Sequence, residues 1–444
     1  MMALHDDPVA TRRDIQAHEF KLNAVFQMSR VLAEFAVCEC PDDGPAPGAI
    51  DLSRLMAKAA MIFNLGGYSD AIRRDVMAPE LRVTPLGDIH ANWGFMDAII
   101  EPFAREVADG RIATAETAYG RRPAPVDDRA SLDDELDPEF VAAFREQMGV
   151  TPNAYRLFVE YLEDLSFVEG GAVIARERSA LFPVQTDLGS LDDETASRLI
   201  DGLTLQPRQA WRETPTGFND RDRHPWRFRR RLSVLRKPLL QLDQTADPRL
   251  VFAPALVREA FVYTLNGYIS GDFPGYQLSP AMTAWAGRRA DLRGRALAEE
   301  TGDALMAAGW RTVVDHKVTR LLGQGFDRDY GDVDVLAWRD DGRVLIIECK
   351  DLQFKKTLSD MSEQLADFRG QTHSNGKRDY LRLHLDRVDL LRNHLGALEK
   401  FIGQPITTPP ESHLVFRHPV PITYGLREMT DVVRVTVFSA VGDL

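Results

Sequence analysis

The feature that most constrains the fold is a pair of apolar segments joined by a short polar turn. Residues 331–338 read Gly-Asp-Val-Asp-Val-Leu-Ala-Trp, and residues 343–350 read Arg-Val-Leu-Ile-Ile-Glu-Cys-Lys. The Asp340-Asp-Gly342 sequence between them is typical of a tight turn, and apolar, β-branched runs on both sides of such a turn predict a β-hairpin. We therefore expect two neighbouring antiparallel strands with buried side chains.

Charged residues interrupt this apolar hairpin. Asp334 lies between two valines, while Glu348 and Lys350 follow the apolar run 344–347. Residues i and i+2 of a strand point to the same face, so Glu348 and Lys350 project together, and folding the hairpin brings Asp334 beside them. Buried carboxylates are costly unless they are compensated, and a hard divalent cation such as Mg2+ meets that need. The alternative is that Glu348 and Lys350 form an ion pair on an edge strand while Asp334 caps a turn.

The segments around the hairpin predict further elements. Residues 295–308 have the apolar spacing of an amphipathic helix that ends at Gly309, and residues 310–318 are typical of a strand. A helix fits residues 359–369, and a strand fits residues 413–416. The expected order is therefore helix, three strands, helix and strand.

These motifs resemble the PD-(D/E)XK nuclease superfamily, the restriction-endonuclease-like fold, over residues 294–425. Gly331-Asp-Val-Asp-Val-Leu-Ala looks like the Gly-x-x-Asp strand of the Mrr-like, RecB-like and archaeal Holliday-junction-resolvase branches, and Ile347-Glu-Cys-Lys350 looks like their Glu-x-Lys strand. The resemblance implies an αβββαβ core and hydrolysis of phosphodiester bonds with Mg2+ or Mn2+. It also favours DNA as the substrate, in restriction, phage defence or repair, by analogy with relatives that carry a large extra domain.

The resemblance assigns roles to individual residues. Asp334 and Glu348 would bind the metal ion, with the backbone carbonyl of Cys349 as a further ligand. Lys350 would orient or help to deprotonate the attacking water and offset charge in the transition state. A metal-bound water has a lowered pKa and so supplies a nucleophile at neutral pH. Asp332 shares a strand face with Asp334, but the family pattern favours Asp334.

Two further catalytic candidates follow from the same resemblance. Many relatives carry a glutamate on the first helix, and the helical wheel favours Glu300, on the flank of the apolar stripe, over Glu299; the alternative is a solvated surface acid. Gln364, with Phe368 four residues later, resembles the Gln-x-x-x-Tyr helix motif of RecB-like nucleases with Phe in place of Tyr. The alternative is an ordinary helix glutamine.

The remaining chain predicts a mostly α-helical N-terminal region, so the expected fold class is α/β. We expect a helical domain over residues 1–125, a linker rich in proline and acid over 120–138, a helical region over 138–290 and the nuclease-like domain over 291–444. Within 138–180, two helices, a turn that contains glycine and a following strand resemble the outline of a winged helix. A plain helical scaffold is the alternative.

Charge is distributed unevenly along the chain. The net charge is -13, yet residues 1–220 sum to -17, residues 221–290 to +7 and residues 291–444 to -3. A strongly acidic surface repels nucleic acid. We therefore expect the acidic front to face a protein partner or to cover the basic segment.

The positive charge is concentrated in residues 221–237, called here the basic strip, where aromatic residues lie among the arginines. Guanidinium groups bind phosphate oxygens and aromatic faces stack on bases, so the strip predicts a nucleic-acid contact. The alternative is that its arginines pair with carboxylates inside the protein. The residues expected to bind nucleic acid are Arg227, Arg229, Arg230 and Arg231, together with Lys355 and Lys356 near the active site.

Other features predict a soluble, cytoplasmic protein. Three cysteines, Cys38, Cys40 and Cys349, do not build a disulfide framework. The N-terminus lacks the pattern of a secretory signal, and no apolar run approaches the roughly 20 residues of a membrane span. The resulting functional prediction is a metal-dependent nuclease; the alternative is a catalytically idle nuclease-fold adaptor that binds nucleic acid or a partner protein.

Overall fold

The computed structural model describes residues 12–39, 44–78, 81–91, 94–107, 131–208, 210–353, 355–373, 376–426, 429 and 431–444. These residues form two compact units. Unit 1 combines described residues of Met1–Gly66 and Arg122–Arg289, and unit 2 combines those of Gly67–Arg121 and Ala290–Leu444. Residues 120–130 of the expected linker lie outside the described residues.

The structure has the expected α/β class, with a largely helical N-terminal half. The two units group the chain differently from the expected segments 1–125, 138–290 and 291–444, although both divisions have a boundary near residue 290. The difference arises because Ile100 and Phe103 pack with Met361, which lies far along the chain in the same unit. Part of the first expected segment therefore contributes to unit 2.

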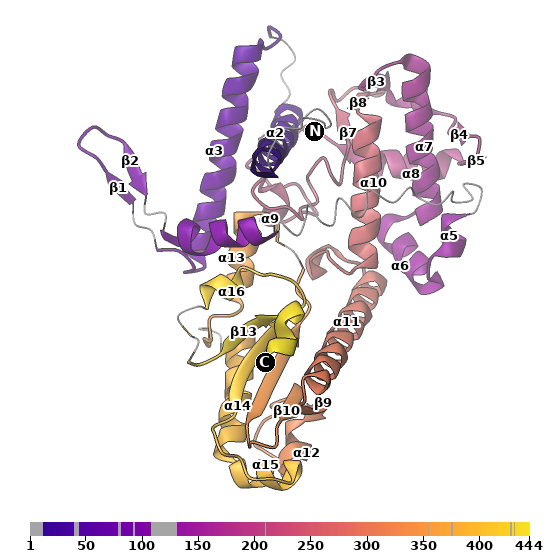
Figure 1. Ribbon diagram of the computed structural model, residues 1–444. Helices are drawn as coiled ribbons and strands as arrows, with labels where there is room; N and C mark the ends of the chain where they lie inside the picture. Colours follow the sequence, from indigo (N-terminus) through magenta and orange to yellow (C-terminus); the bar gives the residue numbers. More distant parts are fainter. Residues whose placement is uncertain are drawn as a thin grey trace. The chain divides into compact units, whose positions relative to one another are not determined.

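Unit 1 contains most of the helices in the first half of the chain (Figure 1). Helices α2 (Arg12–Cys38) and α3 (Ala49–Arg73) come first, and α3 continues beyond Gly66 into unit 2. The helices that follow are α5 (Leu132–Glu135), α6 (Pro138–Met148), α7 (Pro152–Glu169), α8 (Asp193–Leu203), α9 (Asp220–Arg223), α10 (Pro254–Ile269) and the first part of α11 (Pro280–Ala307), with 3-10 turns η2 (Arg178–Leu181) and η3 (Gly275–Gln277). The strands are β3 (Ile174–Glu177), β4 (Gln185–Thr186), β5 (Gly189–Ser190), β6 (Thr204–Leu205), β7 (Leu239–Gln241) and β8 (Arg249–Phe252).

Local sequence explains the helix pair α6 and α7. Asp137 and Thr151 cap their N-termini, proline follows each cap, and Gly149 and Gly170 end them in the left-handed conformation. Strand β3 then follows α7, as in the expected order of helix, helix and strand. It pairs with β8 in a four-stranded sheet of order β3-β8-β7-β6. The next hairpin, β4 and β5, is a separate two-stranded sheet.

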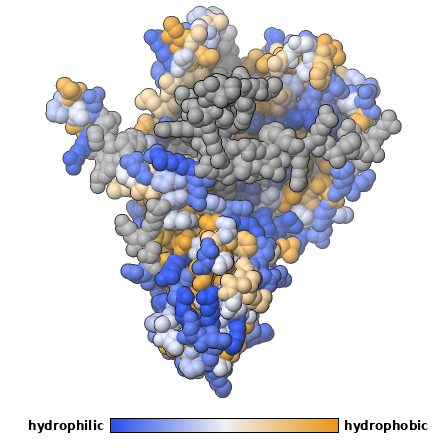
Figure 2. Space-filling model, viewed as in Figure 1, coloured by the Kyte–Doolittle hydropathy of each residue, from blue (hydrophilic) through white to orange (hydrophobic). Residues whose placement is uncertain are grey.

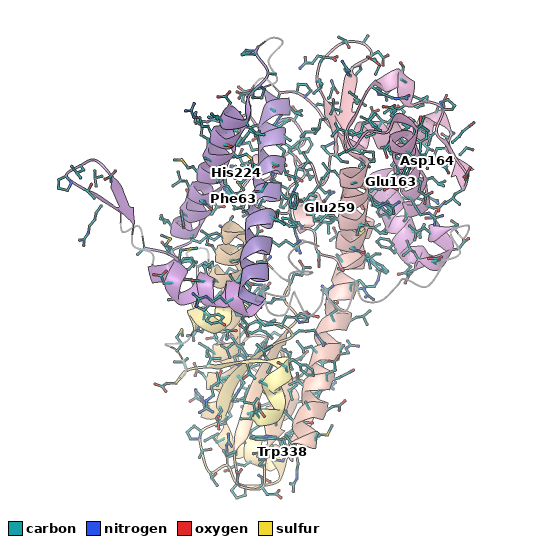
Figure 3. All side chains as sticks on the ribbon, turned by 45° about the horizontal axis from the view of Figure 1, so that its top comes forward. Phe63, Glu163, Asp164, His224, Glu259 and Trp338 are labelled. Atoms are coloured by element: carbon teal, nitrogen blue, oxygen red, sulfur yellow. The ribbon has the colours of Figure 1, made fainter. Side chains whose placement is uncertain are left out.

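Helices α7 and α10 lie together in unit 1, and Figure 3 labels Glu163 on α7 and Glu259 on α10. Glu163 accepts hydrogen bonds from Arg258, while Glu259 pairs with Arg30 of α2 at 3.4 Å. Aromatic and aliphatic side chains of α6, α7, α8 and α10 fill the core of the unit. Arg258 and Glu163 thus join two helices whose apolar faces share one core, and Arg30 and Glu259 join α10 to α2.

Helix α3 carries large apolar side chains on its surface. Ile50, Leu52, Leu55, Met61 and Leu65 are each at least 40% exposed. Figure 2 shows hydrophobic residues on the visible surface at the end of this helix. Among the described helices, none is long and apolar enough to cross a membrane.

Unit 2 is built on a five-stranded sheet (Figure 1). Its strands in chain order are β9 (Arg311–Lys317), β10 (Asp332–Trp338), β11 (Val344–Lys350), β12 (Glu411–Phe416) and β13 (Arg434–Val437). Its helical segments are η1 (Met96–Ile100), the second part of α11, α12 (Val318–Leu322), α13 (Leu358–Ala366), α14 (Tyr380–Asn393), α15 (Leu395–Ile402), α16 (Ile422–Gly425) and η5 (Phe438–Asp443), and a small hairpin joins β1 (Leu81–Val83) to β2 (Ile89–Ala91).

The sheet order is β13-β12-β11-β10-β9, with antiparallel pairing among β9, β10 and β11 and parallel pairing among β11, β12 and β13. One face packs on α11, where Leu345 and Ile347 contact the cluster around Leu297. The other face packs on α14 and α15, where Ile346 contacts the cluster around Val388. Strand β11 is therefore central and buried on both faces.

The order α11, β9, β10, β11, α13 and β12 matches the predicted helix, three strands, helix and strand, with the short helix α12 between β9 and β10 as an unpredicted insertion. The hairpin turn lies at Gly342, which has φ +82° and whose Cα faces Thr407 so closely that an added Cβ would lie 2.5 Å from its side chain. Helices α14 and α15, between α13 and β12, were not predicted. They cover the face of the sheet that carries the charged residues.

Candidate active site

Asp334, Glu348 and Lys350 lie close together at the end of the hairpin away from its turn. Val335 pairs with Ile347 across the hairpin, and the charges of Glu348 and Lys350 both act on Asp334, the residue before Val335. The Lys350 ammonium is 2.6 Å from Oε1 of Glu348, as their i and i+2 spacing predicted. Because β11 is the middle strand of the sheet, the edge-strand alternative for this ion pair is wrong.

Asp334 is held by the backbone of the neighbouring strand. The amide of Cys349 donates a hydrogen bond to its Oδ2 at 2.7 Å. Burial and the charge of Glu348 raise the pKa of Asp334, and Lys350 and the Cys349 amide offset this shift only in part. The side chain thus has a fixed orientation in a place where its negative charge is costly.

Glu348 has two cationic neighbours. Besides Lys350, Arg387 of α14 donates a hydrogen bond to Oε2, and Nδ1 of the fully buried His384 lies 3.8 Å from the same oxygen. Burial by itself would raise the pKa of Glu348, but Lys350 and Arg387 outweigh burial and hold the pKa below its ordinary value. Glu348 is therefore a buried carboxylate that is charged at neutral pH.

Lys350 is also charged at neutral pH. Burial lowers its pKa, but Glu348 and Asp334 together raise it above the ordinary value of a lysine. Its ammonium lies 5.6 Å from the ring centroid of Tyr380, a residue at the start of α14 that is 50% exposed. The lysine thus stands between the buried carboxylates and an exposed aromatic ring.

The residues at this position fit a hard divalent cation. Asp334 and Glu348 provide two neighbouring carboxylates, and the cost of ionising Asp334 is only partly offset by the neighbouring cations. Mg2+ is commonly held by one or two carboxylates, with water and phosphate oxygens as its other ligands. Across the described parts of the chain, no three or more His, Cys, Asp and Glu side chains gather in a cluster that would hold a metal alone. Any cation here would therefore share its coordination with water or substrate.

Gln364 lies on α13 and is 4% exposed. Its Nε2 donates to the backbone oxygen of Gln353 at 3.4 Å, while its Oε1 is a buried acceptor without a hydrogen bond from any described residue. Phe368, at the tyrosine position of the motif, packs against Tyr380 with ring centroids 5.5 Å apart. A tyrosine from α14 therefore lies beside the phenylalanine that replaces the motif tyrosine.

Glu300 is not among the contacts of the paired carboxylates. Arg417 donates hydrogen bonds to both of its oxygens, at 2.8 and 3.1 Å, and the side chain is 46% exposed. Its helix, α11, packs on the face of the sheet that carries Cys349, whose Sγ lies 3.6 Å from Oγ1 of Thr301. Glu348 points to the opposite face, toward Arg387 of α14, and a catalytic role for Glu300 stays a prediction.

The basic strip follows the internal salt-bridge alternative at three positions. Arg229 pairs with Asp272 at 3.3 Å, Arg231 pairs with the fully buried Asp222 at 2.6 Å, and Arg230 pairs with Glu34 at 2.5 Å. The Arg230 side chain is only 6% exposed. These three contacts lie inside unit 1 and explain the arginines without a nucleic-acid partner.

The remaining nucleic-acid candidates differ in exposure. Arg227 is half-buried near the ring pair of His224 and Trp226, whose centroids lie 4.5 Å apart. In the segment between β11 and α13, Lys355 is half-buried and Lys356 is exposed. Both lie shortly after Lys350 in the chain, and their contact with nucleic acid stays a prediction.

Three site residues on α14 were not predicted from the sequence. Tyr380, His384 and Arg387 are spaced i, i+4 and i+7, which places them on one helical face. That face also carries Leu391, which is fully buried. A histidine and an arginine at apolar-stripe positions were the available signal that this helix covers a charged site.

A family model described as "Anti-phage protein Upx-like" matches residues 1–444, the whole chain. Neither the curated proteins nor the solved structures include a significant match. The chain belongs to the family of Upx-like anti-phage proteins.

Proposed function

We propose that this protein defends against phage as a metal-dependent nuclease that hydrolyses phosphodiester bonds, with DNA as its substrate. The observation that supports the proposal most directly is the closeness of the buried carboxylates Asp334 and Glu348, with Lys350 2.6 Å from Glu348. Membership of an anti-phage family is compatible with destruction of invading nucleic acid.

The proposed chemistry divides the work among these side chains. Asp334 and Glu348 would hold Mg2+ or Mn2+, with the Cys349 carbonyl as a further ligand. When bound, such an ion lowers the pKa of a coordinated water and offsets phosphate charge. Lys350, charged and 2.6 Å from Glu348, is suited to orient the attacking water and to balance negative charge that develops on phosphate. Arg387 fixes the carboxylate of Glu348 in place.

A second candidate is a nuclease-fold adaptor that binds nucleic acid or protein without cleavage. The observation that favours it is the pairing of both Glu348 oxygens with cations of the chain itself, Lys350 and Arg387. A carboxylate that is already compensated has less to gain from a metal ion.

A cleavage assay separates the two candidates. Purified protein is incubated with supercoiled plasmid, single-stranded DNA and RNA, with Mg2+, Mn2+ or EDTA. We expect metal-dependent cleavage of DNA that Asp334→Asn and Lys350→Met each reduce at least 100-fold. Asp340→Asn is a matched control, because Asp340 lies at the turn of the same hairpin and its side chain is 82% exposed.

The outcomes assign the function. Cleavage that persists in Asp334→Asn and Lys350→Met would contradict this active site. DNA binding by the wild-type protein without cleavage of any substrate would favour the adaptor. A plaque assay with the same variants adds the cellular readout, in which protection is expected to be lost with Asp334→Asn and kept with Asp340→Asn.

A further inference from the structure

Three arginines of unit 2 converge on one carboxylate. Asp386 of α14 lies 3.1 Å from Nη2 of Arg328 and 3.2 Å from Nε of Arg378, and it also pairs with Arg382. The side chain of Asp386 is 9% exposed, whereas those of Arg328, Arg378 and Arg382 are 30%, 35% and 36% exposed. We call these four residues the Asp386 arginine cluster.

The cluster has more positive charge than its own stability requires. One carboxylate balances one guanidinium, so Asp386 leaves two positive charges in excess. Asp389, 3.9 Å from Arg382 and 57% exposed, offsets part of this charge at the surface. Asp386 is only 9% exposed, so its charge needs a cationic partner. One guanidinium supplies that partner, and further like charges around one acid repel one another. Stability alone is therefore a weak reason for three arginines here.

The cluster adjoins the candidate active site. Arg387 follows Asp386 in α14 and donates hydrogen bonds to Glu348 and, at 3.0 Å, to the backbone oxygen of Tyr330. The ring of the same Tyr330 lies under Arg328, 4.2 Å from the guanidinium carbon to the ring centroid. One tyrosine thus joins the cluster to the arginine that holds the central carboxylate.

The geometry of the cluster suits phosphates. Each guanidinium has five N–H donors in a planar fork that can bind phosphate oxygens in pairs. A buried carboxylate that fixes three such groups lowers the conformational entropy that they would lose on binding a ligand. Tyr380, exposed beside Lys350, adds an aromatic face of the kind on which bases stack.

We propose that the Asp386 arginine cluster binds the phosphodiester backbone of the nucleic-acid substrate as it extends from the candidate active site. The inference rests on the proposed nuclease function and names the surface that holds its substrate. Asp386 acts as a positioning residue, and Arg328, Arg378 and Arg382 contact the phosphates. The sequence-based candidates of the basic strip have no part in this contact.

The test is a binding measurement in the Asp334→Asn background, which removes cleavage as a complication. A fluorescent duplex of about 20 base pairs is titrated at several salt concentrations. We expect the triple variant R328Q/R378Q/R382Q to weaken binding at least tenfold and to reduce the salt slope of log Kd by about 2 to 3, since each phosphate contact contributes about 1. The matched control is R311Q/R320Q/R434Q, which removes three exposed arginines elsewhere in unit 2.

A second variant guards against loss of folding. Asp386→Asn removes the negative charge and keeps the size of the side chain. Tighter DNA binding than in the parent is expected, because the gain of one net positive charge in the cluster outweighs the loss of positioning by Asp386. An unchanged Kd and salt slope in the triple variant, with circular dichroism like that of the parent, would overturn the proposal, as would equal weakening by the control variant.

The two proposals fail separately. DNA binding that depends on the cluster, in a protein that never cleaves, would retain this surface and reject the nuclease. Metal-dependent cleavage with DNA binding that ignores the cluster would retain the nuclease and reject this surface.

Discussion

Arg387 donates a hydrogen bond to Oε2 of Glu348, and the two side chains are only 11% and 10% exposed. A buried carboxylate that loses one of its cationic partners keeps a charge that water cannot reach. This pair therefore connects an element that the sequence did not reveal, α14, to the carboxylate that it did.

We predict that Arg387→Met destabilises the protein by about 3–5 kcal/mol, because it leaves the Glu348 charge poorly compensated. The double variant Glu348→Gln/Arg387→Met should regain at least half of that loss, since the unpaired charge is then removed. Urea denaturation followed by circular dichroism measures both values. Arg311→Met, which breaks an ion pair whose arginine is 59% exposed, is the control and should cost about 0–1 kcal/mol. A loss below 1 kcal/mol for Arg387→Met would contradict the structural role of this pair.

Divalent cations should stabilise the folded protein. A ligand that binds only the folded state at 100 times its Kd contributes about 2.7 kcal/mol. We expect Mg2+ or Mn2+ to raise the melting temperature of the wild-type protein and to leave that of Asp334→Asn nearly unchanged. Differential scanning fluorimetry with a titration of each metal provides the measurement, and the exposed-turn variant Asp340→Asn should respond as the wild type does. Equal shifts in wild type and Asp334→Asn would place the metal elsewhere.

Protonation of His413 should destabilise the protein in acid. Its ring is 1% exposed, and burial lowers the pKa to about 4 from 6.5, although Glu411 opposes the shift; Arg343 and Arg434 also lie near this pair. Between these two pKa values the unfolded state binds the proton more readily, so the free energy of unfolding falls as the pH falls from 6.5 to 4. The loss from this group is about 3 kcal/mol.

The variant His413→Gln isolates this contribution. Denaturation at pH 7 and at pH 4.5 should show a smaller drop in the variant than in the wild type. His384 shifts in the same direction and remains in the variant, so some pH dependence persists. Parallel pH profiles for the two proteins would show that His413 does not titrate during unfolding.

The sequence predicted the β10–β11 hairpin and the closeness of its three charged residues because both depend on short-range patterns. A period of two places Glu348 and Lys350 together, and the turn at Gly342 brings the strand that carries Asp334 beside them. Glu300 accepts hydrogen bonds from Arg417, a partner that the sequence did not predict. A helical wheel identifies which face of α11 is buried, but it carries no information on which face of the sheet receives that helix.

The ion pairs that the sequence did not predict join distant parts of the chain. Arg387 meets Glu348 across 39 positions, and Arg230 meets Glu34 in unit 1 from the far end of a long stretch of sequence. No local period encodes such pairs. An arginine on an apolar helical stripe shows that a partner exists, yet the partner itself becomes visible only in the fold.

In the basic strip the nucleic-acid contact expected from the sequence differs most from the structure, where its arginines form internal ion pairs. Arg230 and Glu34 are buried at 6% and 8% exposure, so Arg230→Met should destabilise the protein by about 3–5 kcal/mol, and Arg230→Met/Glu34→Gln should recover much of that loss.

In the Asp334→Asn background, Arg231→Gln, which breaks the pair with Asp222, should leave the salt dependence of DNA binding unchanged. Fluorescence anisotropy across a salt series measures this slope, with Arg378→Gln as the comparison that should reduce it. A fall in slope for Arg231→Gln equal to that for Arg378→Gln would return the strip to the nucleic-acid interface, because it would show that Arg231, although paired one-to-one with Asp222, neutralises a phosphate.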